Sequence, residues 1–140
     1  MREIKFRAKS SGSWHYGFYV HFDDKDKKDA IYNFKCNDFI VSNSKLGTYN
    51  IPITEPETLG QYVGVKDKNG NDIYEGDILE YKNVDNTYYR YVEWNHGCFR
   101  MTNDRYGFSN PISSYLENSK TKIDDWEIIG NVHDNPELKE

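Results

Sequence analysis

The sequence predicts a mainly β protein, a β-rich α+β fold, and three observations support this prediction. Aromatic residues make up 16% of the 140 residues, as 12 Tyr, 7 Phe and 3 Trp. Tyrosine, threonine, valine and isoleucine favour strands, whereas alanine, the best helix former, occurs only at positions 8 and 30. Short segments of alternating polarity also recur between turn residues along the chain, as they do in sandwiches and small barrels.

The first strands are predicted to form a hairpin. The segments EIKFRAK (3–9) and WHYGFYVHF (14–22) lie on either side of the turn-forming residues SSGS. One set of alternate positions in the second segment carries large apolar side chains: Trp14, Tyr16, Phe18, Val20 and Phe22. A period of two predicts a strand that buries one side, and we expect the buried side to be this apolar one.

The rest of the N-terminal part is predicted to contain a loop, two strands and a linker. The charged run DDKDKKD (23–29) is expected to form a solvated loop, and AIYNFK (30–35) and DFIVS (38–42) are expected to form short strands. The stretch NIPITEPETLG (50–60) contains two prolines and little periodicity. It is therefore predicted to link two parts of the chain.

This linker divides the chain into an N-terminal β-rich subdomain (1–55) and a C-terminal subdomain (56–140). In the second part, strand candidates follow one another at short intervals: 61–66, 72–74, 77–82, 88–94, 98–102, 111–116 and 126–132. Short strands separated by turn residues predict a small barrel or sandwich. Asn135 before Pro136 predicts one helical turn near the end, since proline is favoured at the first helical position.

The stretch GQYVGVKDKNGNDIYEGDIL (60–79) looks most like a functional motif. It lacks the GK[ST] ending of a phosphate-binding loop, and its glycines do not form GxGxxG before a helix. Asn69-Gly70 instead predicts the two-residue turn of a hairpin, with Gly70 at positive φ.

The same stretch contains four carboxylates: Asp67, Asp72, Glu75 and Asp77. Their spacing is not that of an EF-hand calcium loop, which ends in a glutamate at its twelfth position. We expect Gly76 to bend the chain and Asp77 to accept hydrogen bonds from backbone N–H groups. The sequence therefore predicts no metal site here.

The cysteines and histidines form no recognisable catalytic or metal-binding pattern. Cys36 and Cys98 lack CxxC spacing, and free buried thiols in a cytosolic protein are predicted. His96 lies two residues before Cys98, as a base might before a nucleophile, but Gly97 between them predicts a hairpin turn. A catalytic pair also needs a third group that holds the imidazole. We therefore predict no enzyme activity, no cofactor and no zinc site.

The distribution of charge argues against a large phosphate-binding surface. The net charge is −5. Residues 1–55 carry nine basic and seven acidic side chains, whereas residues 56–140 carry nine basic and sixteen acidic ones. Nucleic-acid affinity rests mainly on lysine and arginine, so double-stranded DNA is not expected to be a tight ligand. The first residues lack the apolar run of a signal peptide, and no stretch has the ~20 apolar residues of a membrane helix.

Four blocks of sequence resemble those of a known family. REIKFRA, GQYVGVKDKNGNDIYEGDIL, VEWNHGCF and WEIIGNVHDNPEL occur in this order, and together they resemble the YopX family of bacteriophage and prophage proteins in Firmicutes. The family commonly has Trp-Asp after FRA, where this chain has Lys9 and Ser10. The resemblance implies a phage or prophage gene, expression in the host bacterial cytoplasm, and an SH3-like barrel in the C-terminal half. It implies no catalytic or binding residues.

The favoured function is that of a non-enzymatic accessory protein that acts through protein–protein contacts, as a homo-oligomer or with a host or phage partner. In the strand 88–94, Val92 and Trp94 are predicted to lie in the core. Tyr89 and Tyr91 would then lie outside and, with Arg90, form an interaction surface. Two tyrosines from neighbouring strands could join them: Tyr81 and Tyr106.

Two alternatives to this interpretation remain. In the first, the loop 103–110 or the N-terminal part covers Tyr89 and Tyr91. In the second, the C-terminal part is a small barrel that binds single-stranded nucleic acid by stacking bases on aromatic rings beside basic side chains. The arginines available for that role are Arg90, Arg100 and Arg105.

Overall fold

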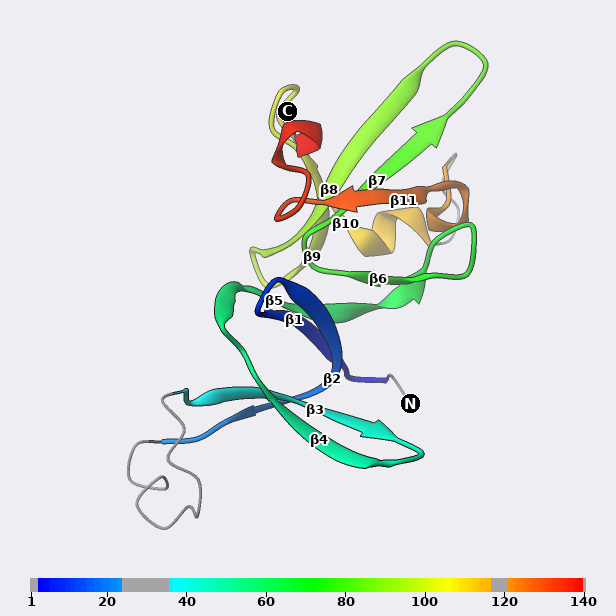
Figure 1. Cartoon of the computed structure of the whole chain (residues 1–140). Coiled ribbons are helices and arrows are strands. Elements are labelled where there is room, and N and C mark those ends of the chain that lie inside the picture. The colour runs from blue at the N-terminus through cyan, green and yellow to red at the C-terminus, as the bar shows by residue number, and fades with distance from the viewer. Residues whose placement is uncertain (1–2, 24–35, 117–120, 140) are drawn as a thin grey trace. The chain divides into compact units, whose positions relative to one another are not determined.

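The computed structural model describes residues 3–23, 36–116 and 121–139 (Figure 1). These residues form strands β1–β11, and the helical elements among them, η2 to η4, are 3₁₀ turns of three or four residues. The prediction of a mainly β protein is confirmed. The predicted strand 30–35 and most of the predicted loop 23–29 lie outside the described residues. No helix in the described part of the chain is long and apolar enough to cross a membrane.

The chain divides into two compact units, Met1–Gln61 and Tyr62–Glu140, which we call unit 1 and unit 2. Each contains an antiparallel sheet, and neither sheet closes into a barrel within the described residues. The SH3-like architecture therefore remains a prediction. The long strand β5 (Glu55–Lys66) begins in unit 1 and ends in unit 2.

Unit 1 is a sheet in which the strands follow the order β4-β3-β2-β1-β5. Its further strands are β1 (Phe6–Ser10), β2 (Ser13–His21), β3 (Asp38–Ser44) and β4 (Gly47–Pro52). The predicted hairpin is confirmed as β1 and β2. Its turn residues Ser11 and Gly12 both have positive φ, 50° and 82°, which is typical of a type I′ turn.

The prediction of which side of β2 is buried is wrong. Tyr16, Phe18 and Phe22 are 50%, 57% and 43% exposed. The core of unit 1 lies on the other face of the sheet, where these side chains pack together: Ala8, Ile40 and Ile53, with Phe6, Tyr19 and Leu59 at its edge. On that side β3 approaches β2 so closely at position 17 that no side chain fits, because a Cβ atom at Gly17 would collide with the carbonyl oxygen of Val41.

The prediction that residues 50–60 form an irregular linker is also wrong, because most of these residues belong to the end of β4 and the start of β5. Side chains replace regular ladder bonds where β5 pairs irregularly with β1. Thr58 Oγ1 accepts a hydrogen bond from the Lys9 N–H at 2.8 Å, and Thr54 Oγ1 accepts one from the Ser11 N–H at 2.7 Å. The two prolines of this stretch therefore fit at a strand end and in an irregular pairing, where proline is tolerated.

Unit 2 contains a five-stranded sheet in the order β10-β9-β8-β7-β11, and a hairpin of β5 and β6. Its further strands are β6 (Asp72–Tyr74), β7 (Asp77–Lys82), β8 (Thr87–Asn95), β9 (Cys98–Asn103), β10 (Phe108–Pro111) and β11 (Glu127–Asn131). Six of the seven predicted strands are confirmed. The predicted strand 111–116 is instead the turn η2 (Ile112–Tyr115). Its buried residues Ile112 and Tyr115 are three apart, the repeat of a 3₁₀ helix.

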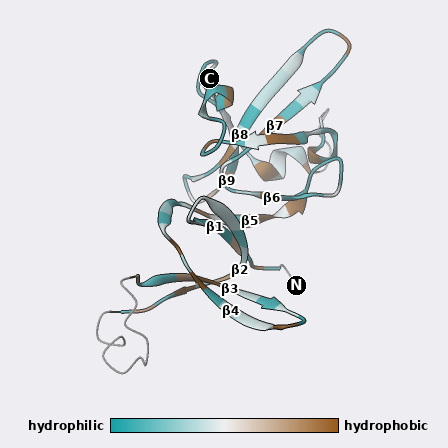
Figure 2. Ribbon diagram, viewed as in Figure 1, coloured by the Kyte–Doolittle hydropathy of each residue, from teal (hydrophilic) through white to brown (hydrophobic). Residues whose placement is uncertain are grey.

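The core of unit 2 lies on one face of its sheet, beneath η2 and η3 (Ile123–Asp125). It is formed by Val63, Ile73, Leu79, Val92, Met101, Ile112, Tyr115, Ile123 and Trp126. Part of β8 is pale rather than brown in Figure 2, because tyrosine and threonine contribute much of this strand. Val92 is in the core as predicted, but Trp94 is 57% exposed, so its predicted place there is wrong. Trp94 does meet Phe99 across the hairpin, with ring centroids 4.9 Å apart.

The loop between β5 and β6 is organised by a buried carboxylate. Gly70 has a φ of 83°, as predicted, but the turn spans residues 67–71 rather than two residues. Asp67 Oδ1 accepts hydrogen bonds from the N–H groups of Asn69 and Asn71, both at 2.9 Å, and its Oδ2 accepts one from Ile128 N–H at 3.0 Å. This carboxylate therefore holds the loop in place and ties it to β11.

The end of the same motif behaves as predicted. Gly76 has a φ of 90°, and Asp77 Oδ2 accepts a hydrogen bond from the Tyr74 N–H at 2.8 Å. Asp72 lies 2.9 Å from Lys66 Nζ in an ion pair. Within the described ranges, no group of three or more histidine, cysteine or acidic side chains is arranged to hold a metal ion.

Candidate interaction surfaces

The predicted surface on β8 is only partly exposed. Tyr89 and Tyr91 do point away from the core residue Val92, and Tyr89 is 40% exposed. Tyr91 is 8% exposed, so the prediction that it lies outside is wrong. Its hydroxyl donates a hydrogen bond to Asp104 Oδ1 at 2.8 Å, and Lys139 Nζ lies 4.5 Å from its ring centroid.

Two segments therefore cover Tyr91: the loop after β9, which was the predicted alternative, and the C-terminal turn η4 (Pro136–Lys139). This turn is the short helix predicted from Asn135 and Pro136. A cation above an aromatic ring is attracted by the electron-rich face of the ring. Burial, followed by the hydrogen bond to Asp104, raises the pKa of Tyr91.

Arg90 lies among aromatic rings on the core side of the sheet. Its guanidinium carbon is 5.3 Å from the ring centroid of Phe108 and 5.8 Å from that of Trp126. Its Nη1 donates a hydrogen bond to the Tyr89 carbonyl oxygen at 2.7 Å. Tyr81 packs at 5.6 Å on Trp126 on this same side, so its predicted place beside Tyr89 is wrong.

The other two arginines proposed for nucleic-acid binding also have intramolecular partners. Arg100 donates from Nε to Ser109 Oγ at 2.8 Å and from Nη2 to the Ser109 carbonyl at 2.9 Å. The guanidinium carbon of Arg105 is 5.5 Å from the Tyr106 ring centroid. These contacts disfavour a row of phosphate ligands along β8 and β9.

Two exposed tyrosines of unit 2 are connected by one buried amide. Asn103, which is 7% exposed, donates from Nδ2 to the Tyr89 carbonyl at 3.0 Å. Its Oδ1 accepts a hydrogen bond from the Tyr106 N–H at 3.1 Å, and Tyr106 is 65% exposed. We call Tyr89 and Tyr106 the tyrosine surface. Its backbone is fixed before any partner binds.

An open hollow of about 700 Å³ lies among charged side chains of the same region. It is lined by Asp104, Arg105, Glu137 and Lys139, and Lys139 Nζ is 3.7 Å from Asp104 Oδ2. Two of its lining residues also contact the rings already described, Asp104 at Tyr91 and Arg105 at Tyr106. The hollow thus offers both signs of charge beside the exposed ring of Tyr106.

The candidate cysteine–histidine pair lies in a hairpin turn, as predicted. His96 and Gly97 have φ values of 51° and 79° between β8 and β9. Cys98 Sγ lies 3.8 Å from the Asn95 carbonyl oxygen, to which it donates, and 3.4 Å from Arg100 Nη1. Cys36 and Cys98 are both free thiols and are half-buried.

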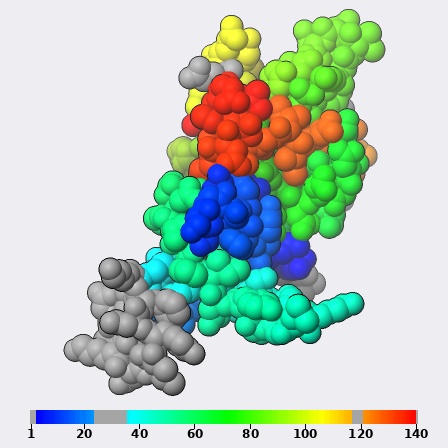
Figure 3. All heavy atoms as spheres, viewed as in Figure 1, coloured from blue at the N-terminus to red at the C-terminus, as the bar shows by residue number. Residues whose placement is uncertain are grey.

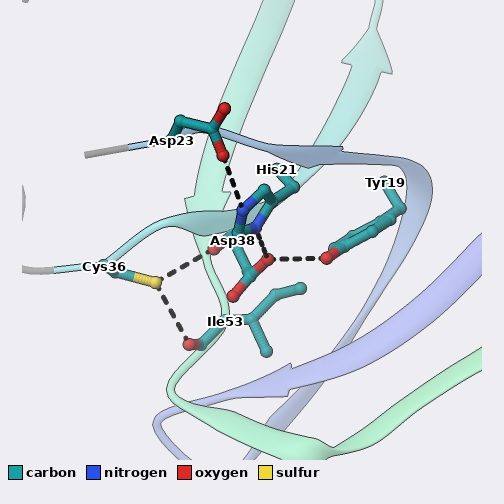
Figure 4. Close-up of polar contacts among 6 residues, drawn as sticks. All are labelled: Tyr19, His21, Asp23, Cys36, Asp38 and Ile53. Carbon is teal, nitrogen blue, oxygen red and sulfur yellow. Dashed lines mark hydrogen bonds and ion pairs between the residues drawn. The ribbon is translucent and has the colours of Figure 1, made fainter. Parts of the chain in front are cut away.

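A polar cluster in unit 1, missed in the sequence, joins the ends of β2 and β3 (Figure 4). Asp38 Oδ1 accepts a hydrogen bond from the Tyr19 hydroxyl at 2.6 Å and lies 2.7 Å from His21 Nδ1. His21 Nε2 is 3.5 Å from Asp23 Oδ1. Because Asp38 pairs with His21 across the two strands, the cluster becomes visible only once the strand register is known.

The contacts of this cluster favour a structural role. The hydrogen bond to Asp38 raises the pKa of Tyr19 to about 12, and the same carboxylate raises the pKa of His21. Both imidazole nitrogens face carboxylates, so the ring is stabilised as a cation rather than presented as a base. Cys36 Sγ donates to the carbonyl oxygens of Asp38 and Ile53 at 3.0 and 3.3 Å.

The sequence matches the family described as YopX protein over residues 5–140. The chain belongs to the YopX family. No protein with a curated description matches it in sequence.

Two solved structures are similar to this YopX-family chain. Protein EF1440 from Enterococcus faecalis is 25% identical, with a TM-score of 0.54 and all of both chains covered. Protein yopX from Bacillus subtilis is 16% identical, with a TM-score of 0.58, covering 100% of this chain and 98% of the other. At 16% identity, the similarity to yopX supports the fold alone.

Proposed function

We propose that this YopX-family chain is a non-enzymatic accessory protein, encoded by a phage or prophage, that binds another protein in the host cytoplasm. The observation behind this proposal is the tyrosine surface, Tyr89 and Tyr106, beside a hollow of mixed charge. Tyrosine gives a large, rigid contact area with a hydrogen-bonding tip, and interfaces are enriched in tyrosine and arginine.

The electrostatics of unit 2 favour a protein over a nucleic acid at this surface. Residues 62–140 carry nine basic and fifteen acidic side chains. Arg105, the basic residue next to Tyr106 in the sequence, has its guanidinium carbon 5.5 Å from the centroid of the Tyr106 ring. A protein partner can pair with both signs of charge in the hollow, whereas a phosphate backbone would be repelled by the acidic surroundings.

The described polar clusters support a non-enzymatic role. Asp38, Asp67 and Asp77 each accept hydrogen bonds that hold strands or turns together. His21 faces two carboxylates and His96 lies at a hairpin tip. Catalytic groups need a poised base and an accessible reacting centre, and these contacts serve the fold instead.

Site-specific photocrosslinking tests the proposed surface. A photoreactive phenylalanine analogue is placed at Tyr106, or at Val84 as a control, and both proteins are irradiated in the bacteria that produce them. Val84 is fully exposed in the turn between β7 and β8, also in unit 2. We expect a discrete protein adduct from position 106 that is lost with Tyr89→Ser. Equal adducts from both positions, or none from position 106, would contradict the proposal.

A further inference from the structure

The hairpin of β5 and β6 contains the one Asn-Gly pair of the sequence, Asn69-Gly70. Both residues are exposed, and a Cβ atom at Gly70 would meet nothing within 4 Å. Atoms of this hairpin, in green, lie at the surface beside those of β11, in orange, in Figure 3. Because glycine has no side chain, its backbone nitrogen is the least shielded that can follow an asparagine. The pair is therefore accessible to water and can react through its backbone.

An asparagine before a glycine can lose its side-chain amide without an enzyme, which is one reason that asparagine counts as a thermolabile residue. The backbone nitrogen of Gly70 gives up its proton and attacks Asn69 Cγ. The new N–C bond closes a cyclic imide, and the amide nitrogen of the side chain leaves as ammonia. Water then opens the imide at either carbonyl group, which gives aspartate or isoaspartate at position 69. One water is consumed, one ammonia is released, and nothing is oxidised or reduced.

The structure holds the reacting nitrogen in a hydrogen bond. Gly70 N–H donates to the Asp67 carbonyl oxygen at 3.0 Å. On either side, the N–H groups of Asn69 and Asn71 donate to Asp67 Oδ1, both at 2.9 Å. Asp67 is 4% exposed, and its Oδ2 also accepts a hydrogen bond from the backbone of β11. The proton that the reaction must remove is thus held by a residue that is itself fixed.

The side chain of Asn69 also has a partner. Its Nδ2 donates to Glu127 Oε1 at 3.2 Å, and Lys68 Nζ lies 3.3 Å from Glu127 Oε2. A carboxylate at position 69 cannot donate this hydrogen bond and would face the carboxylate of Glu127. Isoaspartate would also add a carbon atom to the backbone within the turn that Asp67 fixes. Loss of the amide would therefore weaken the link between this hairpin and β11.

We propose that Asn69 is a deamidation site of the folded protein, and that Asp67 slows the reaction by holding the Gly70 N–H. Water is the only co-reactant. One backbone hydrogen bond that must first break lowers the rate roughly five- to tenfold. This inference goes beyond the proposed protein contact, because it concerns a covalent change in another part of unit 2.

Peptide mapping by mass spectrometry tests the proposal on the full, unsubstituted chain. The protein is kept at pH 8 and 37 °C, either folded or unfolded in guanidinium chloride, and is then digested with pepsin at low pH. In the unfolded chain we expect Asn69 to be the first asparagine converted to an acid, with heavy oxygen taken up from labelled water. The folded chain should react at Asn69 roughly five- to tenfold more slowly.

Three results of this mapping would overturn the proposal. The first is a rate at Asn69 in the folded chain that equals or exceeds the rate in the unfolded chain. The second is an earlier reaction at another asparagine of the unfolded chain. The third is an unchanged Asn69 in the folded chain after eight weeks.

Two buried carboxylates supply matched variants. Asp67→Ala keeps the backbone carbonyl group but removes the side-chain acceptors that fix the turn around it, so Asn69 should react at close to the rate of the unfolded chain. Asp77→Ala is the control, because Asp77 is 1% exposed and holds the next turn through the Tyr74 N–H. Circular dichroism checks that both variants are folded. Equal acceleration by the two variants would mean a general loosening and would overturn the role of Asp67.

The modified protein itself tests the predicted consequence. Its additional negative charge allows anion exchange to separate it from the unmodified chain after the incubation. We expect a lower melting temperature for the modified fraction, because the hydrogen bond from Asn69 to Glu127 is lost. Equal melting temperatures for the two fractions would overturn the predicted weakening of the link to β11.

Discussion

Strands β2 and β8 follow the same alternating pattern but bury their rings in opposite ways. In β2 the aromatic set Tyr16 and Phe18 is exposed, and the side with Gly17 and Tyr19 faces the core. In β8 the core side carries Val92, and Tyr91 on the other side is buried by segments that follow later in the chain. Alternation therefore identifies a strand, but what packs against each face decides which rings are buried.

The largest expected effect contrasts a core leucine with an exposed ring. Leu79 in β7 is 0% exposed, whereas Phe18 in β2 is 57% exposed. Leu79→Ala should lower the free energy of unfolding by about 2–5 kcal/mol through lost contacts and a cavity. Phe18→Ala should change it by no more than ~0.5 kcal/mol. Urea unfolding followed by circular dichroism measures both, and a large loss with Phe18→Ala would show that the side of β2 that carries Phe18 is a core.

The close approach of β2 and β3 at Gly17 gives the next effect. Any side chain there meets the Val41 carbonyl group, so Gly17→Asn should destabilise the chain by about 1–3 kcal/mol through overpacking. Gly70→Asn is the control, because a Cβ at Gly70 has open space and asparagine tolerates positive φ. Gly70→Val should still cost about 1–2 kcal/mol, since a β-branched residue is strained at that φ. Thermal melts would rank the three variants by melting temperature. A melting temperature for Gly17→Asn equal to that of the unsubstituted protein would contradict the close packing of β2 on β3.

The cover over Tyr91 predicts a smaller effect. Tyr91→Phe removes the hydroxyl that donates to Asp104, and about 1 kcal/mol of stability should be lost with it. Tyr89→Phe, two residues earlier on the same strand face, should leave stability unchanged because its ring is 40% exposed. Equal urea midpoints for the two variants would mean that the hydrogen bond from the Tyr91 hydroxyl to Asp104 does not stabilise the fold.

The smallest effect concerns the pH dependence of unit 1. Asp38 raises the pKa of His21 in the folded chain, so His21 stabilises the fold below its unfolded pKa, near 6.5, and this contribution is lost as pH rises through the folded value. His21→Gln should therefore lower the melting temperature more at pH 5.5 than at pH 8.5. His15→Gln is the matched control on the same strand. An equal loss of melting temperature in His21→Gln at the two pH values would contradict a charged His21.

The parts of the fold that sequence reasoning found depend on local signals. Residues 72–74 and 77–82 were predicted with the bounds of β6 and β7, and Gly70, Gly76 and Gly97 have the positive φ that a turn requires. Turn chemistry is set by neighbouring residues along the chain. It can therefore be predicted without knowing the sheet.

The parts that were missed depend on residues distant in sequence. Tyr91 and Lys139 are far apart along the chain, and no periodicity links them. The Tyr19–Asp38 contact requires the register between β2 and β3. The predicted strand 111–116 failed for a local reason, because two apolar residues three apart also fit one 3₁₀ turn. Burial and clusters thus needed the tertiary structure.

The contact of the C-terminal turn with Tyr91 gives this protein a built-in optical reporter. Because burial and the hydrogen bond to Asp104 raise the pKa of Tyr91, it should ionise above the usual range of a tyrosine. Ultraviolet difference spectra recorded during alkaline titration would show late ionisation of both Tyr91 and Tyr19, whose pKa is also raised, and the part lost in Tyr91→Phe belongs to Tyr91. Removal of the residues after Asn135, which form the turn over Tyr91, should lower the pKa of Tyr91 toward its ordinary value. Affinity tags are therefore better placed at the N-terminus, where they leave this turn undisturbed.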